Sequence, residues 1–254
     1  HCVKRNTGME LKELIEKRWQ ASAEGYGESI RKELSDEREK WEAYIQKHVM
    51  VEEGMKILDI GCGPGFFTIL MSGEGHETMG IDASSKMIEE AKKNAKQESA
   101  NAVFKVMDCH HIEFPDNTFD LIISRNVVWT LLEPEKAYRE WYRILKPGGK
   151  MLIFDAAYNR EFHDPKLMEE KKRRKKELGI DSEESEYFCR DQKLGLELDQ
   201  RSVLGAVDRP EWDEKVLKEI GFLVATDRDA WKEVGRKMPD RWVNLAPLFL
   251  LECR

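Results

Sequence analysis

From residue 55 onward, short apolar runs alternate with stretches whose apolar residues recur at helical spacing. This pattern predicts strands at the apolar runs and helices between them. The expected strands are residues 55–60, 77–81, 103–107, 119–124 and 150–154, and the expected helices begin at residues 66, 84 and 133. Such alternation is typical of parallel strands joined by right-handed crossovers, so we expect an α/β core at 55–155 whose sheet is covered on both faces.

Apolar residues at helical spacing also precede this core and predict an N-terminal helical cap over residues 9–48. We expect two helices there, because Gly25 and Gly27 interrupt the pattern and indicate a mobile break around Tyr26. Neither helix can bury its apolar stripe alone, so both should pack on the core. Residues 1–8 show no clear pattern.

The strand–helix rhythm stops between residues 159 and 209, where we expect a helical insertion that acts as a lid. Residues 211–254 then predict a helix that Gly221 ends, followed by strands at 222–226 and 246–253. Because the chain shows no internal repeat and no low-complexity linker, we expect residues 1–254 to form a single domain with an insertion.

Composition excludes several classes of protein. With 41% hydrophobic residues the chain can bury a sizeable core, and its net charge of −7 argues against a nucleic-acid partner. No apolar run reaches the roughly 20 residues that cross a bilayer, and the start of the chain lacks a secretory apolar segment. The scattered cysteines favour reduced thiols, so we expect a cytoplasmic protein without a bound metal.

The loop after the first expected strand carries Gly61, Gly63 and Gly65 and opens a helix. Glycine permits a sharp turn and lets the backbone approach a ligand without an intervening Cβ, while the helix start offers free N–H groups to an anion. A dinucleotide loop would need its third glycine at position 66, where this chain has Phe66. The spacing favours a small carboxylate-bearing ligand over a pyrophosphate, with a plain tight turn as the alternative.

Acidic residues stand at the ends of the next two expected strands. Asp82 can accept hydrogen bonds from both hydroxyls of a ribose, or it can simply cap the helix that begins near Ser84. Asp108 can accept a hydrogen bond from an adenine amino group while the Cys109 N–H donates to a ring nitrogen, or it can be an ordinary loop residue. Together with the glycine loop, these acids favour an adenosyl amino acid as the ligand.

Four segments in order, Ile57–Gly65, Gly80–Ser84, Phe114–Ser124 and Arg143–Gly149, resemble the class I S-adenosylmethionine-dependent methyltransferases. The similarity is strongest to the group related to the quinone-biosynthesis enzymes (methyltransferase type 11). The resemblance implies S-adenosyl-L-methionine as cofactor and S-adenosyl-L-homocysteine as product. It also implies a Rossmann-like fold with a seven-stranded, mostly parallel sheet that ends on an antiparallel strand.

The resemblance also implies roles for individual residues. The glycines would flank the methionine moiety, Asp82 would hold the ribose and Met87 would lie beside the adenine. The backbone of Arg125 would meet the methionine amine, and Tyr26 would lie over the cofactor, with plain packing as its alternative. The implied cofactor site comprises Tyr26, Asp59, Gly61, Cys62, Gly63, Gly65, Asp82, Ala83, Met87, Asp108, Cys109 and Arg125.

Methyl transfer from a sulfonium is an in-line displacement, for which an enzyme mainly supplies alignment, a closed site and, where the acceptor needs it, a base. The acceptor should enter over the carboxyl ends of the strands. Our candidate catalytic residues near this edge are Tyr26, Arg125, Tyr158 and His163. Packing is the alternative role for each, and His110 and His111 fit exposed loop residues better than bases.

A basic run at residues 171–176 leaves an RNA-directed methyltransferase, or an RNA-binding module, as the alternative function. Neighbouring acids nearly neutralise this run, and the Asn/Asp-Pro-Pro-aromatic motif of base-methylating enzymes is absent, so a small-molecule acceptor is favoured. Phe66 disfavours a nicotinamide-dependent oxidoreductase. An arsenite methyltransferase would need a cysteine trio, for which the spacing of Cys62, Cys109 and Cys189 gives no support. The sequence does not indicate the oligomeric state.

Overall fold

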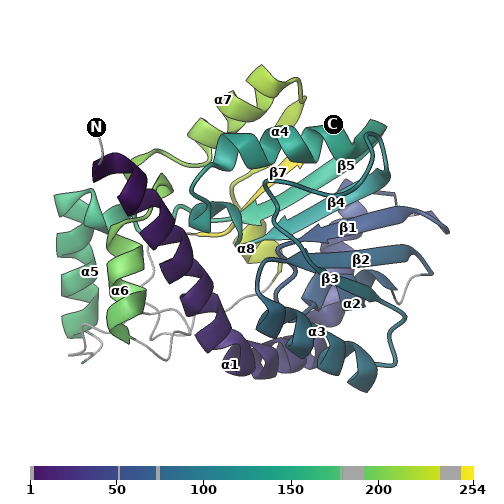
Figure 1. Cartoon of the computed structure of the whole chain (residues 1–254), viewed down its shortest axis with the longest axis horizontal. Helices are drawn as coiled ribbons and strands as arrows, with labels where there is room; N and C mark the ends of the chain where they lie inside the picture. Colours follow the sequence, from purple (N-terminus) through teal and green to yellow (C-terminus); the bar gives the residue numbers. More distant parts are fainter. Residues whose placement is uncertain (1–2, 51, 73–74, 178, 180–191, 235–246) are drawn as a thin grey trace.

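The computed structural model describes residues 3–50, 52–72, 75–177, 179, 192–234 and 247–254. It contains a seven-stranded sheet with the order β3-β2-β1-β4-β5-β7-β6 (Figure 1). The strands are β1 (Lys56–Ile60), β2 (Glu77–Asp82), β3 (Val103–Val106), β4 (Phe119–Arg125), β5 (Leu145–Asp155), β6 (Val224–Asp227) and β7 (Phe249–Cys253). The expected α/β fold with a mostly parallel, seven-stranded sheet is confirmed.

Strand β7 alone among these runs against its neighbours. It pairs antiparallel with both β5 and β6, so β6 points in the same direction as the parallel strands. We expected β5 to begin at residue 150, but it begins five residues earlier, at Leu145. Leu145 pairs with Phe119 of β4, and the register then shifts so that Lys150 pairs with Leu121. Ala246, where the last strand was expected to begin, lies outside the described residues.

The predicted break in the N-terminal region is wrong, because α1 (Val3–His48) is one continuous helix. Gly27 is buried where α1 packs on α3 (Ser85–Gln97), and a Cβ there would lie 2.5 Å from Oε2 of Glu90 on that helix. The glycine therefore permits close helix packing instead of breaking the helix. A glycine costs a helix about 1 kcal/mol relative to alanine, and the packing of α1 on the core outweighs this cost.

Helices cover both faces of the sheet (Figure 1). One face packs against α1, α2 and α3, and its core contains Ile57, Ile123 and Leu152. The other face packs against α4 and α7 through the alternate strand residues Leu58 and Ile122, as expected for strands buried on both sides. The helices of these two layers are α2 (Phe66–Ser72), α3 (Ser85–Gln97), α4 (Pro134–Ile144), α7 (Glu211–Ile220) and α8 (Ala230–Glu233).

Two further helices, α5 (Pro165–Glu177) and α6 (Gln192–Gln200), lie away from the sheet, and α6 packs against the N-terminal half of α1 (Figure 1). A buried ion pair between Arg18 of α1 and Asp199 of α6, at 2.7 Å, joins α6 to α1. Short 3-10 helices, η1 (Val128–Thr130), η2 (Arg160–Phe162) and η3 (Leu204–Ala206), connect this region to the sheet. The division into a cap, a core, a lid and a C-terminal unit remains a prediction.

Among the described residues, no helix combines the length and the apolar composition that crossing a membrane would require.

Candidate functional site

A cleft of about 660 Å³ lies at the carboxyl ends of the parallel strands, next to the N-terminal half of α1. Its walls come from the loops after β1, β2, β3 and β4, which are far apart in sequence and meet because the strands are parallel neighbours. The predicted site residues that line it are Tyr26, Gly61, Gly63, Asp82, Ala83, Met87, Asp108, Cys109 and Arg125.

The glycine loop combines a tight turn with an open face. Gly61 has a φ of 66°, and a Cβ there would lie 2.2 Å from Cγ2 of Val127, so only glycine fits beside the loop after β4. Gly63 has a φ of 50°, and a Cβ there would meet nothing within 4 Å. The backbone at Gly63 is therefore open to whatever occupies the cleft.

Three predicted cofactor residues, Asp59, Cys62 and Gly65, do not line the cleft. Asp59 is buried and accepts hydrogen bonds from the backbone N and the Oγ1 of Thr68, at 2.9 and 2.7 Å. Burial raises the pKa of Asp59 to about 6, although these hydrogen bonds oppose the shift. Asp59 thus holds the first turns of α2 in place and supports the loop from behind.

Asp82 lies at the tip of β2 and fixes the shape of the loop. One carboxylate oxygen accepts from the Gly63 N–H at 2.9 Å and the other accepts from the Ser84 N–H at 2.8 Å. The helix cap is Ser84 itself, whose hydroxyl accepts from the Met87 N–H. A carboxylate has about four acceptor positions, so Asp82 can still accept from two ligand hydroxyls. Burial raises its pKa to about 6.

Asp108, at the end of β3, is held by the residues around it. Burial alone would raise its pKa, but hydrogen bonds from the backbone N and the ring of His110 lower it to about 2. Lys12 of α1 donates to its second oxygen at 3.3 Å. Asp108 is therefore ionised throughout the neutral range and links α1 to the sheet.

Asp108, Cys109 and His110 bring three possible metal-binding atoms within 4.8 Å of one another. Burial raises the pKa of the Cys109 thiol, which disfavours the thiolate that a metal ion needs. Asp108 and His110 are already hydrogen-bonded to each other, with 2.7 Å between Oδ1 of Asp108 and Nδ1 of His110. The absence of a metal remains a prediction.

The candidate catalytic residues are only partly brought together. Tyr26 and Arg125 line the cleft, whereas Tyr158 and His163 do not. The Arg125 guanidinium donates to both oxygens of Glu33, at 2.6 and 3.1 Å, and lies over the ring of Phe66. Its side chain is thus committed to α1, and only its backbone remains for a ligand.

The two candidates outside the cleft have structural contacts. Tyr158 is 7% exposed, and its hydroxyl donates to Oδ1 of Asn126 at 3.1 Å, so it positions a residue that does line the cleft. His163 is exposed and lies against Gly205, where a Cβ would be 2.8 Å from the His163 ring. Neither side chain faces the space that a cofactor would occupy.

Sequence reasoning assigned only Tyr26 of α1 to this cleft and missed the other α1 residues. Lys12, Ile15, Glu16, Trp19 and Tyr26 all line it. Their spacing follows one face of a continuous helix, so the signal was present in the sequence. It was hidden because the glycines at 25 and 27 were taken to separate Tyr26 from the earlier residues.

Both the sequence and the fold match those of known methyltransferases. The model of the family described as "Methyltransferase domain" matches residues 51–233. Phosphoethanolamine N-methyltransferase 1 of Arabidopsis thaliana is 33% identical over 202 residues, which are 78% of this chain and 35% of that protein. Demethylmenaquinone methyltransferase of a Geobacillus species is 30% identical over 122 residues, or 46% of this chain and 52% of that protein.

A solved structure has the same fold. Phosphoethanolamine N-methyltransferase 2 of Haemonchus contortus, in complex with S-adenosyl-L-methionine, aligns with a TM-score of 0.57 and 19% identity. The alignment covers 83% of this chain and 51% of that chain.

The chain belongs to the methyltransferase-domain family, since the family model matches well over half of it. It is a methyltransferase domain with the Rossmann-like fold of the class I enzymes. The chain spans about a third of the length of the Arabidopsis relative.

Proposed function

We propose that this protein transfers a methyl group from S-adenosyl-L-methionine to a small-molecule acceptor by in-line displacement. One observation carries the proposal: a single cleft joins the open backbone at Gly63 with Asp82 and Asp108 at neighbouring strand tips. Carboxylates placed in this way can accept from ribose hydroxyls and from an adenine amino group.

The residues of the cleft fit the cofactor. Its volume lies within the range of about 300–1,000 Å³ that is usual for ligand sites. Asp82 would hold the ribose, the backbone of Gly61 and Gly63 would face the methionine part, and Met87 would contact the adenine. When bound, the sulfonium of the cofactor supplies an electrophilic methyl group.

The remaining task of the chain is alignment and exclusion of water. Helix α1 contributes Trp19 and Tyr26, whose rings meet edge to face with their centroids 6.3 Å apart. These rings would cover the cofactor and leave the acceptor to approach past Asn126. Alignment of this kind lowers the barrier of a displacement reaction. We propose Tyr26 as an aligning residue, in place of a catalytic base.

Calorimetry with S-adenosyl-L-homocysteine tests the proposal directly. We expect one binding site per chain with micromolar or tighter affinity, because the cleft is formed before the ligand arrives. Adenosine diphosphate, which shares the ribose and adenine but replaces the amino acid with a pyrophosphate, serves as the control and should bind far more weakly. Absence of S-adenosyl-L-homocysteine binding at high micromolar concentration would remove the proposed function.

The alternative acceptor, RNA, rests on the basic run in α5. Part of this run is paired with acids nearby: Lys171 with Glu161 at 2.6 Å, and Arg174 with Glu170 at 2.7 Å. Paired cations release few counterions from a polyanion, which favours the small-molecule acceptor.

We therefore expect the salt dependence of RNA retention to be weak and unchanged when Lys172, Arg173 and Lys176 are replaced together by glutamine. A filter-binding series between low and physiological salt measures the slope. A steep slope that falls by about one for each cation removed would instead favour RNA as the acceptor.

A further inference from the structure

A second, smaller pocket adjoins the cofactor cleft. It lies between α1, η1, the loop after β5 and the region of α6, and it has a volume of about 30 Å³. The two cavities share Ile15, Trp19 and the stretch 130–132. Because η1 and the β5 loop follow the carboxyl ends of β4 and β5, this pocket lies on the side from which an acceptor should approach.

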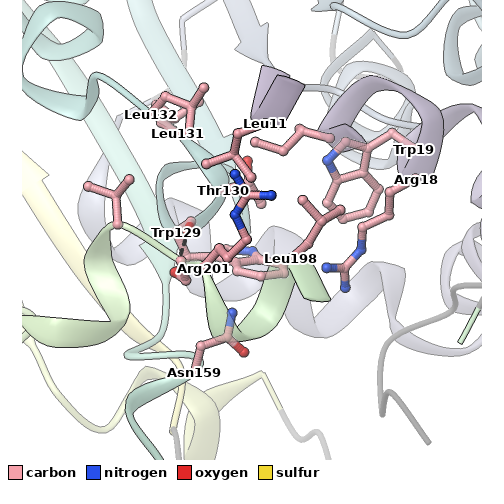
Figure 2. A pocket seen from close by; sticks show the side chains of 13 residues that line it. Leu11, Arg18, Trp19, Trp129, Thr130, Leu131, Leu132, Asn159, Leu198 and Arg201 are labelled. Carbon is pink, nitrogen blue, oxygen red and sulfur yellow. Dashed lines mark hydrogen bonds between the residues drawn. The ribbon is translucent and has the colours of Figure 1, made fainter. Parts of the chain in front are cut away.

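Asn159 gives the pocket a specific chemistry. The residue is 1% exposed and lines the pocket, yet neither its Nδ2 nor its Oδ1 has a hydrogen-bond partner. Figure 2 shows its amide directed from the β5 loop toward the other lining side chains. Burying an amide without partners is unfavourable, so a ligand that supplies both a donor and an acceptor would stabilise this arrangement.

The rest of the pocket is apolar and aromatic. Trp19 and Trp129 meet edge to face with centroids 6.2 Å apart, and the Arg18 guanidinium lies over both rings at 5.3 and 5.4 Å. Leu11 and Leu198 close the sides (Figure 2). Since Arg18 already lies against these indole rings, they do not form a vacant cage for a cationic ligand.

The cationic side chains around the two cavities are neutralised within the protein. Arg18 pairs with Asp199 at 2.7 Å, and Arg201 pairs with Glu197 at 3.0 Å. The lysines and the arginine that line the cleft are paired as well. Lys12 pairs with Asp108, Arg125 with Glu33 and Lys136 with Glu133, each within 3.5 Å. Among the described Lys and Arg residues that line the two cavities, none is left without an acidic partner, which disfavours attraction of a phosphate or carboxylate.

We propose that this pocket binds the end of the methyl acceptor that is remote from the reacting atom, and that this end is an uncharged group that both donates and accepts hydrogen bonds, such as a carboxamide. A volume of about 30 Å³ admits a group of this size but no ring, so the apolar body of the acceptor extends past Trp19 into the cleft. The inference rests on the proposed function, because the cleft must hold the cofactor for the body to meet it.

Three probes with one ring and different end groups test the inference: benzamide, benzoate and benzylamine. Each is titrated by ligand-observed NMR into the full chain saturated with S-adenosyl-L-homocysteine. We expect benzamide to bind roughly tenfold more tightly than either charged probe, because only the amide satisfies both atoms of Asn159. Preference for benzoate or benzylamine would overturn the inference.

Two substitutions assign the effect to Asn159. The residue has a φ of 68°, a conformation that glycine and aspartate tolerate. Asn159→Gly should weaken benzamide binding roughly tenfold, and Asn159→Asp should shift the preference to benzylamine by adding a negative charge. The matched control is Asn117→Gly, at an exposed position with a φ of 55°, which should change nothing.

Titration of S-adenosyl-L-homocysteine on each variant separates the two proposals. Failure of that ligand to bind the unmodified chain would remove the proposed function, whereas normal binding together with equal affinity for the three probes would remove this inference alone. A crystal structure with benzamide that shows only water beside Asn159 would also overturn it.

Discussion

Replacement of Asp82 by alanine will lower the affinity for S-adenosyl-L-homocysteine by at least about a hundredfold. The carboxylate would accept from two ribose hydroxyls, and hydrogen bonds to a charged group are each worth about 1.5–3 kcal/mol. It also accepts from the Gly63 and Ser84 N–H groups, so its loss would loosen the glycine loop as well. Calorimetry on the folded variant measures the change, and Asp36→Ala, which removes an exposed acid on α1, is the control.

The pH dependence of the same binding gives a check that does not depend on the alanine variant. Because burial raises the pKa of Asp82 to about 6, its carboxyl takes up a proton as the pH falls below 6. At pH 5 about a tenth of it stays ionised, so affinity should drop roughly tenfold from its value at pH 7. Asp108, with a pKa of about 2, stays ionised in this window, whereas Asp59, whose pKa is also about 6, titrates together with Asp82 but does not line the cleft. A flat profile in the unmodified chain would contradict the assigned role, and Asp82→Asn should flatten it.

Much of the core could be predicted because the signals are local. The strands and the acids at their tips follow from apolar runs that end at Asp82 and Asp108, and parallel pairing then brings these tips to one edge. The position of β7 between β5 and β6 was less accessible, since pairing of distant strands depends on the whole sheet. The prediction of the fold rested on the alternation of strands and helices, and the family resemblance added the antiparallel strand.

The parts that sequence reasoning missed depend on long-range contacts. Gly27 looks like a helix breaker in isolation, and only the approach of Glu90 on α3 shows why the helix continues through it. Arg125 was a reasonable catalytic candidate from its position in the sequence, but in the structure its guanidinium is hydrogen-bonded to Glu33, which is 92 positions away. Neither partner could be assigned from spacing, because each contact joins the core to a helix whose placement was unknown.

Replacement of Arg209 by methionine will destabilise the protein by about 3–5 kcal/mol, because it leaves two buried acids without a counter-charge. The guanidinium is 1% exposed and lies 2.8 Å from an oxygen of Asp213 and 3.2 Å from an oxygen of Asp155. Asp213 also accepts from the Tyr138 hydroxyl at 2.6 Å, so the network joins α4, α7 and the end of β5. Urea unfolding of the variant at neutral pH measures the loss.

An exposed arginine that also pairs with α7 supplies the comparison. Arg228 pairs with Glu211 and Glu214 at 3.0 and 3.3 Å while 53% of its side chain is exposed, so Arg228→Met should cost less than about 1 kcal/mol. Equal losses in the two variants would show that burial of the acids is not the cause.

The pH dependence of the Arg209→Met variant follows from the same charges. Burial raises the pKa of Asp155 to about 6 even though Arg209 opposes the shift, and removing Arg209 raises it further. A carboxyl whose folded pKa lies above its unfolded value loses stability as the pH rises between the two. The deficit of the variant should therefore be smallest near pH 4–5 and largest above pH 7.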